Sequence, residues 1–178
     1  MKKNEGFTLI ELLIVVAIIG LIAAIAVPGL LRARMSGNEA SAIGSLRAIN
    51  SGESTYASSC ASGGYAVLLA DLAKTPPSST SAFISPDMAL DPTIKSGYTV
   101  TLAIDGSAGV NNAVTAAANT CNTSSTDAAS SYYASAVPVT LGSTGQRAFA
   151  TDTRGTIFFD NTGVAPANPI PAAATALQ

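Results

Sequence analysis

Few side chains of this 178-residue chain could carry out covalent or acid–base chemistry. Histidine is absent, which excludes a Ser-His-Asp triad, a Cys-His pair and a metal held by imidazole. Seven aspartates follow residue 60, but they are scattered singly, mostly beside Gly, Pro, Ser or Thr, as turn residues are. We therefore expect no enzyme active site, no bound cofactor and no metal site.

The remaining candidate is Glu11, a carboxylate inside an apolar segment. Residues 7–31 read FTLIELLIVVAIIGLIAAIAVPGLL, and Glu11 is their single charge. The 20 uncharged residues from Leu12 to Leu31 would form a helix about 30 Å long, the thickness of a bilayer's hydrocarbon core. A charge in that setting costs more than the helix macrodipole returns to an anion in the first turn. We therefore expect Glu11 to have a functional partner.

Residues 1–6, Met-Lys-Lys-Asn-Glu-Gly, are short and polar and begin with basic side chains. A basic stretch before an apolar run is typical of a secretory signal peptide, and Ala24-Ile25-Ala26 has the small-x-small pattern of a cleavage site. Against this interpretation, Val27-Pro28 would follow the cut and Glu11 would lie inside the apolar segment. A permanent membrane anchor is a second interpretation.

A resemblance gives a third interpretation. The segment Gly6-Phe7-Thr8-Leu9-Ile10-Glu11-Leu12 resembles the cleavage and methylation motif of bacterial type IV pilins and type II secretion pseudopilins. The match combines a short basic leader, the glycine before the cut, the phenylalanine after it, the glutamate four residues later and the apolar run. The resemblance continues through Pro28 to about Tyr56 and implies that residues 1–6 are a leader peptide.

The resemblance assigns roles to individual residues. It implies that a prepilin peptidase cuts after Gly6 and methylates the new amino group of Phe7. It also implies that Glu11 pairs with the Phe7 amine of a neighbouring subunit during assembly. In the resembled family, the stretch that corresponds to Gly20–Pro28 can unwind in the assembled filament.

The resemblance also implies partners and a location. The partners are copies of the chain itself in a helical filament, the prepilin peptidase and methylase, an assembly ATPase and an inner-membrane platform protein. The chain would be a single-pass precursor in the bacterial inner membrane with a cytoplasmic N-terminus, and then an extracellular or periplasmic filament. The charges alone do not orient the helix, because two lysines precede the span and Arg32 and Arg34 follow it. No basic patch with interleaved aromatics is present, so we predict no nucleic-acid contact.

A long helix must position these residues. Residues 7–31 are its membrane or filament-core part, and residues 32–59 are an amphipathic continuation, because their apolar side chains fall close to a helical stripe. A helix from Phe7 to about Ser58 would be roughly 75 Å long. Two features of the first part bear on packing. Pro28 invites a kink, and a small-residue face formed by Ala17, Gly20 and Ala24 allows close helix approach.

Residues 60–178 are the predicted extracytoplasmic head domain. We expect a short helix at residues 64–74 and strands at residues 97–104, 132–141, 147–151 and 156–160. About four antiparallel strands packed on the long helix give an α+β fold. The resemblance implies that this is the pilin fold. The low-complexity residues 105–131 are predicted to form a loop, and the tail after Gly163 to be irregular and mobile.

Cys60 and Cys121 would lie outside the cytoplasm, where disulfides persist. A bridge between them would close a loop of 61 residues, worth about 4 kcal/mol on the chain-entropy model. We favour this bridge over two unpaired thiols. It differs from many type IV pilins, whose two cysteines bracket a loop near the C-terminus.

The predicted function is that of a structural subunit, a major or minor pilin, of a type IV pilus or pilus-like filament. The main alternative is a pseudopilin of a type II secretion system. A secreted binding domain that uses residues 1–26 as a conventional signal peptide is a third candidate, and its mature chain would begin at Val27 instead of Phe7. An enzyme is disfavoured by the absent histidine and the scattered carboxylates.

Overall fold

The computed structural model describes residues 7–107 and 112–177. The predicted leader, residues 1–6, and with it the cleavage residue Gly6, lies outside the described residues. The first element is one helix, α1 (Leu9–Ser59), of 51 residues. It confirms the predicted long helix almost to the residue at both ends.

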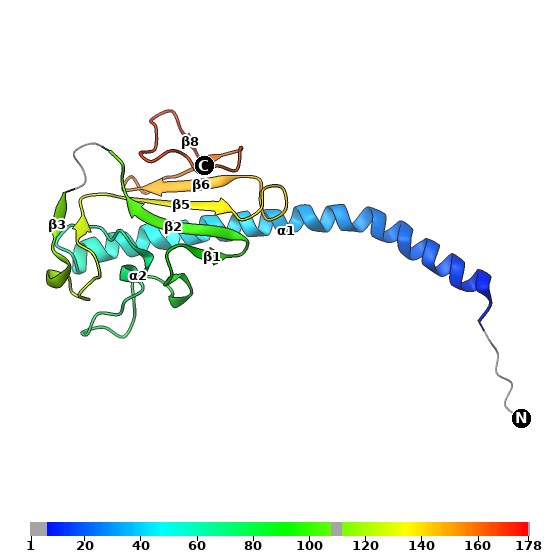
Figure 1. Ribbon diagram of the computed structural model, residues 1–178, viewed down its shortest axis with the longest axis horizontal. Helices are drawn as coiled ribbons and strands as arrows, with labels where there is room; N and C mark the ends of the chain where they lie inside the picture. The colour runs from blue at the N-terminus through cyan, green and yellow to red at the C-terminus, as the bar shows by residue number, and fades with distance from the viewer. Residues whose placement is uncertain (1–6, 108–111, 178) are drawn as a thin grey trace, which may run out of the picture. The chain divides into compact units, whose positions relative to one another are not determined.

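The chain divides into two compact units, Met1–Arg34 and Met35–Gln178. In the described part of the first unit, α1 is the only element, and it continues through Pro28 without a break. Proline has no backbone N–H, so the helix continues although one of its hydrogen bonds is missing at Pro28. The second unit contains the rest of α1 and every strand of the described residues (Figure 1).

The second unit is built on a six-stranded sheet with the order β1-β2-β5-β6-β7-β8, in which every neighbouring pair is antiparallel. The α+β fold is therefore confirmed, with two short strands more than the sequence predicted. The bounds of the strands are β1 (Thr93–Lys95), β2 (Tyr98–Ile104), β5 (Tyr132–Pro138), β6 (Ala148–Asp152), β7 (Ile157–Asp160) and β8 (Thr175–Ala176).

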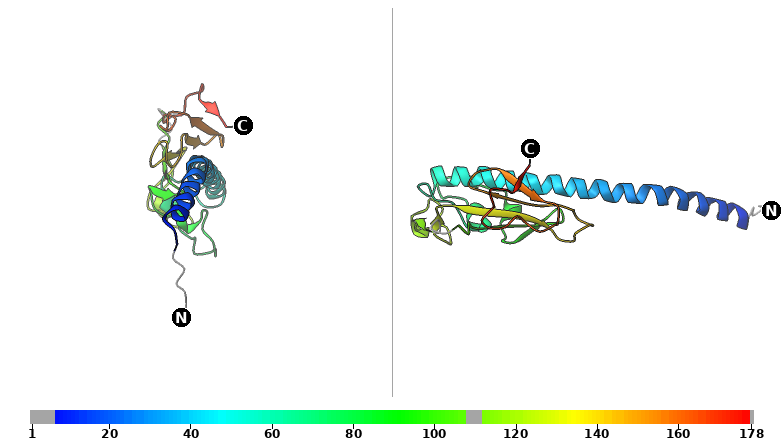
Figure 2. Two further views of the ribbon diagram at one scale, coloured as in Figure 1. Left: turned by 90° about the vertical axis from the view of Figure 1, so that its right-hand side faces the viewer. Right: turned by 90° about the horizontal axis from the view of Figure 1, so that it is seen from above.

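One face of the sheet packs on the second part of α1 (Figure 2). Along β2, the alternating residues Tyr98, Val100 and Leu102 are buried, as the polar–apolar alternation predicts. Leu46 and Ile49 of α1 are fully buried in the same cluster. This layer of side chains is the main core of the unit.

Polar groups fix the register between α1 and the sheet. Asn50 donates to Thr151 Oγ1 at 3.0 Å and to the Gly155 carbonyl at 3.0 Å, and it accepts a bond from the Tyr132 hydroxyl. Because a buried polar group is costly without partners, each of these bonds favours one register of the helix on the strands.

A second anchor joins Glu39 of α1 to the start of β6. Its carboxylate accepts N–H bonds from Gln146 and Arg147 at 3.0 and 3.2 Å, and the Arg147 guanidinium lies 2.8 Å from it. Partial burial raises the pKa of Glu39, but the bonds from Gln146 and Arg147 outweigh this and hold the pKa below its usual value.

Glu53, also on α1, is held differently. It is fully buried; one carboxylate oxygen accepts the Ala66 N–H at 2.9 Å, and the other has no partner among the described residues. Burial raises its pKa well above the usual value. The neutral acid is therefore the form that the fold favours.

The prediction that the tail after Gly163 is irregular is partly wrong. Ile170 is buried against Tyr133, Ala150 and Phe158 on the face of the sheet that points away from α1, and β8 pairs with β7. The Arg154 guanidinium donates to the Ile170 carbonyl at 3.3 Å and lies over the Phe158 ring. The tail thus forms a third layer, which is held on the sheet by the buried Ile170 side chain and by the pairing of β8 with β7.

Two further predictions need correction. The predicted helix at residues 64–74 shrinks to one turn, α2 (Leu69–Leu72), because Tyr65 instead forms a bridge with Ala129. The predicted loop at residues 105–131 contains a two-stranded ribbon of β3 (Ala113–Thr115) and β4 (Ala128–Ala129). In both places tertiary pairing overrides the local sequence preference.

The predicted disulfide between Cys60 and Cys121 is present. It joins the residue after the end of α1 to the segment between β3 and β4. A backbone bond from the Cys121 N–H to the Cys60 carbonyl, 3.1 Å long, accompanies it. The segment between β3 and β4 is thereby fastened to the end of the helix.

Candidate assembly segment

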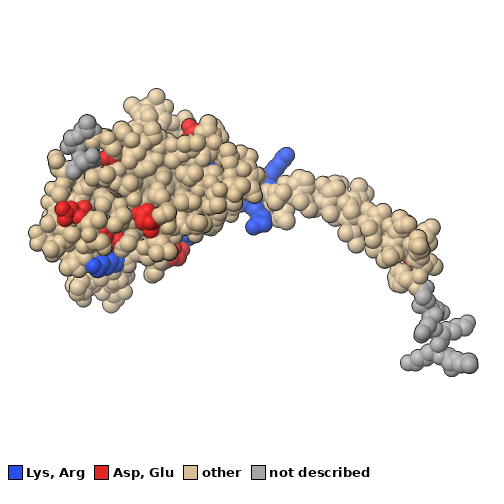
Figure 3. Space-filling model, in the orientation of Figure 1, with Lys and Arg blue, Asp and Glu red and all other residues tan. Residues whose placement is uncertain are grey.

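Residues 7–31 form an apolar surface that nothing in the described chain covers. Among the described residues, α1 is the one helix that is long and apolar enough to cross a membrane, and none of its apolar stretch is buried. Phe7 is 84% exposed and Ile25 is 74% exposed. The visible surface of this segment is almost free of charged side chains (Figure 3).

The exposed side chains surround the helix and do not form one stripe. They are Phe7, Leu9, Ile10, Leu12, Leu13, Ile14, Val15, Val16, Ile18, Ile19, Leu21, Ile22, Ile25, Val27, Leu30 and Leu31. Burying one such side chain is worth about 1.5–3 kcal/mol. A helix that is apolar all round requires either lipid or other apolar helices around it.

Glu11 lies in the first turn of α1 and forms a reciprocal pair with Thr8. One carboxylate oxygen accepts bonds from the Thr8 N–H at 3.0 Å and from the Thr8 hydroxyl at 2.5 Å. The Glu11 N–H donates back to the Thr8 hydroxyl at 3.3 Å. This is a capping box, in which two side chains satisfy the free N–H groups at the start of a helix.

Thr8 was not singled out by the sequence analysis. The signal that could have found it is the pattern Thr-x-x-Glu directly before an apolar run, which predicts a helix start. Glu11 therefore has a local structural role as well as the assembly role that the resemblance implies. The second role is not tested by a single copy of the chain.

The other predicted assembly residues lie along the same helical segment. Gly20 has no atom within 4 Å of the position that a Cβ would occupy, apart from its own helix. Gly20 and Pro28 are both helical here. The predicted unwinding between them concerns an assembled filament and remains a prediction.

The aspartates of the second unit have local roles. Asp152 forms a salt bridge with Arg154 at 2.6 Å, and Asp160 accepts bonds from Thr162 in its own turn, which hold the pKa of Asp160 below its usual value. Within residues 7–107 and 112–177, no group of three or more Cys, Asp or Glu side chains could hold a metal ion.

The N-terminal part of the chain is similar to known proteins. Residues 1–27 match the family model described as the prokaryotic N-terminal methylation motif. The chain is 43% identical over 54 residues to the type IV major pilin protein PilA of Myxococcus xanthus. The matched stretch covers 30% of this chain and 24% of that protein.

Two further relatives match over shorter stretches. The type IV wide pilus major component PilA4 of Thermus thermophilus is 56% identical over 39 residues, 22% of this chain and 30% of that protein. A fimbrial protein of Pseudomonas aeruginosa is 75% identical over 28 residues, 16% and 18% of the two chains. The chain thus matches less than a third of each relative's length. The N-terminal part of the chain is thus similar to that of type IV pilins, and the α+β fold, in which a long N-terminal helix packs on a small antiparallel sheet, is pilin-like.

Proposed function

We propose that this chain is a structural subunit, a major or minor pilin, that polymerises through the first part of α1 into a type IV pilus or pilus-like filament. The observation that carries the proposal is the exposed apolar segment with a single carboxylate in its first turn. Sixteen large apolar side chains without cover make an isolated chain unstable in water. A lipid bilayer and a bundle of identical helices are the two surroundings that remove this cost.

Storage and assembly then use the same surface. Before assembly, the segment spans the inner membrane as a single-pass precursor with its N-terminus in the cytoplasm. In the filament, the same segments of other copies replace the lipid. Because lipid is as apolar as another helix, close packing and polar pairing must favour the filament. The small residues Ala17, Gly20 and Ala24 would allow that close packing.

The proposed maturation prepares the polar pair. Cleavage after Gly6 creates an amino group on Phe7, which is then methylated. That cation would pair with Glu11 of a neighbouring subunit. A misplaced subunit would leave a carboxylate unpaired among apolar side chains, which is a costly arrangement, so the pair would select the correct register.

The further partners come from the family. A prepilin peptidase that is also a methylase would act on residues 6 and 7, and an assembly ATPase and an inner-membrane platform protein would drive addition of subunits. These partners are inferred from the resemblance and not from a binding surface of this chain.

The mature N-terminus tests maturation. Filaments sheared from cells, digested and analysed by mass spectrometry should yield an N-terminal peptide that begins at Phe7 with one added methyl group. A Gly6→Leu variant should keep residues 1–6 and remain in the membrane fraction. A mature chain that begins at Val27 would instead support a secreted domain with a conventional signal peptide, and would overturn the proposal.

A pseudopilin of a type II secretion system is the alternative filament subunit. The disulfide favours neither class decisively, because it joins the end of α1 to residue 121 and does not enclose a C-terminal loop. Electron microscopy with an antibody to this chain separates the two classes. Long labelled surface fibres from cells at native expression support the pilus; labelling confined to the envelope, with loss of secretion in a deletion strain, supports the pseudopilin.

A further inference from the structure

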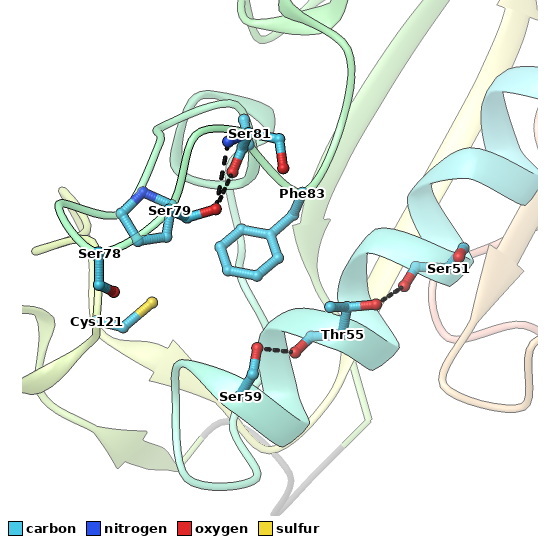
Figure 4. A pocket seen from close by; sticks show the side chains of 10 residues that line it. Ser51, Thr55, Ser59, Ser78, Ser79, Ser81, Phe83 and Cys121 are labelled. Carbon is cyan, nitrogen blue, oxygen red and sulfur yellow. Dashed lines mark hydrogen bonds between the residues drawn. The ribbon is translucent and has the colours of Figure 1, made fainter.

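A groove beside the second part of α1, outside the apolar residues 7–31, has the lining of a binding site. It lies between the helix face with Ser51, Thr55 and Ser59 and the loop of residues 76–83 (Figure 4). Its volume is about 380 Å³. That volume falls in the range of roughly 300–1,000 Å³ that is typical of small-molecule sites.

Hydroxyl groups dominate the lining. Among the ten described residues that line the groove, none is ionisable, and six carry a hydroxyl: Ser51, Thr55, Ser59, Ser78, Ser79 and Ser81. An ionised ligand would lose its hydration without gaining a charge-assisted bond from these residues. The lining therefore suits a polar ligand without net charge.

Three of the six hydroxyls already donate their hydrogens within the protein. The Thr55 hydroxyl donates to the Ser51 carbonyl at 2.9 Å, and the Ser59 hydroxyl donates to the Thr55 carbonyl at 2.6 Å. The Ser79 hydroxyl donates to the Ser81 carbonyl at 3.1 Å. Each hydroxyl has one hydrogen and two lone pairs, so all three keep the capacity to accept. The groove thus favours a ligand that brings its own O–H donors.

Phe83 supplies an apolar surface inside this polar lining. Its ring lies between the hydroxyls of α1 and those of Ser79 and Ser81 (Figure 4). It packs edge-to-face on Tyr56 with ring centroids 5.3 Å apart. The loop approaches α1 so closely at Gly52 that a Cβ there would lie 2.9 Å from the Phe83 carbonyl oxygen. These contacts fix the ring in the absence of a ligand.

The groove continues past Phe83. A second hollow of about 590 Å³ shares Ser51, Ser81 and Phe83 with the first and extends to Ala48 and Thr80. Two hollows that share these lining residues offer room for a chain-like ligand of more than one unit.

We propose that this groove binds a neutral oligosaccharide. A pyranose ring presents C–H groups on its faces and hydroxyls around its rim, which matches an aromatic ring flanked by hydrogen-bond acceptors. Phe83 would contact the C–H face of one sugar, and Thr55, Ser59 and Ser79 would accept bonds from sugar hydroxyls. This activity is separate from polymerisation through residues 7–31.

The test uses the full chain solubilised in a detergent without a sugar headgroup. Saturation-transfer NMR is recorded with maltopentaose, cellopentaose and chitopentaose as neutral probes and with pentagalacturonate as an acidic probe. At least one neutral probe should bind saturably, and the acidic probe should bind more weakly. Absence of saturable binding by all three neutral probes overturns the proposal, as does tighter binding of the acidic one.

Two variants locate the binding. Phe83→Leu keeps apolar volume but removes the aromatic face, and should weaken the neutral probe by about tenfold; Thr55→Val keeps the side-chain shape without the hydroxyl, and should weaken it by about threefold. Ser54→Ala changes an exposed hydroxyl of the same helix outside the groove and should leave binding unchanged. Thermal unfolding verifies that each variant is folded. Equal affinity of Phe83→Leu, Thr55→Val and the parent chain places the ligand elsewhere and overturns the proposal.

Discussion

The two parts of α1 belong to one helix but bury their apolar side chains by different means. In residues 9–34 the large apolar side chains are exposed on all sides, whereas in residues 35–59 one stripe, including Leu46 and Ile49, is buried against the chain's own sheet. The second part thus completes its core within one molecule. The first part requires lipid or further copies.

The three glutamates of α1 follow the same division. Glu11 bonds only to Thr8 of its own turn, Glu39 bonds to Arg147 and two backbone N–H groups, and Glu53 is buried with one backbone donor. In the second part the fold itself supplies the partner of each carboxylate. In the first part that partner lies in the same helical turn.

The largest effect on this division should come from the disulfide. Cys60→Ser with Cys121→Ser frees a loop of 61 residues and should destabilise the second unit by about 4 kcal/mol, or roughly 8–16 °C in melting temperature. Calorimetry of the solubilised chain measures this. Helicity of residues 9–34 should not change, and an equal loss there would show that the two parts of α1 are coupled.

Glu39→Ala should have the next largest effect. It removes the acceptor of two backbone N–H groups and of the Arg147 guanidinium, and should cost about 2 kcal/mol of unfolding free energy. Urea unfolding checks the value. Glu39→Gln, which keeps an amide oxygen as acceptor, is the matched control and should lose less.

Glu11→Gln should separate the two roles of that carboxylate. Glutamine can still accept the Thr8 bonds of the capping box but carries no charge, so the melting temperature of the second unit should be unchanged while filament yield falls at least tenfold. Thr8→Val removes the cap and keeps the charge, and should reduce yield far less. Quantitative immunoblots of sheared filaments measure yield. Normal yield from Glu11→Gln would disprove the charge pairing.

The smallest expected effect is a change in how stability depends on pH. The pKa of Glu53 is raised in the fold, so its contribution to folding stability is complete below about pH 4.5, the pKa of the unfolded state. This contribution is lost as the pH rises through the pKa of the folded state. Glu39, whose pKa is lowered, contributes above its unfolded pKa and loses this as the pH falls. Glu53→Gln should therefore reduce the loss of unfolding free energy as the pH rises. Glu39→Gln should reduce the loss of unfolding free energy as the pH falls. Urea titrations from pH 3.5 to 8 distinguish the two slopes.

Long, periodic segments could be predicted from the sequence. The uninterrupted helical pattern predicted α1, and alternation predicted β2, β5, β6 and β7 close to their observed bounds. Strands β1 and β8 have three and two residues, too few for a period to be recognised, and their existence depends on neighbouring strands. The packing of the tail on the sheet depends on one residue, Ile170, and no local sequence pattern predicts that Ile170 is buried.

The predictions about sites divide in the same way. The disulfide followed from compartment chemistry and is present in the fold. The shortening of α2 could not be predicted, because the Leu69 N–H at its start bonds to Asp91, a residue 22 positions away. The roles of Gly6, Phe7, Gly20 and Pro28 concern cleavage and intermolecular contacts, so the fold of one chain does not test them.

The capping box has a consequence for docking. Both bonds from Thr8 end on the same Glu11 oxygen, Oε2, and no described residue donates to Oε1. An incoming ammonium could therefore be received by the vacant oxygen while the first turn stays wound. Subunit addition would not have to dismantle the beginning of the helix, and the energy of the new ion pair would be added to the existing bonds instead of replacing them.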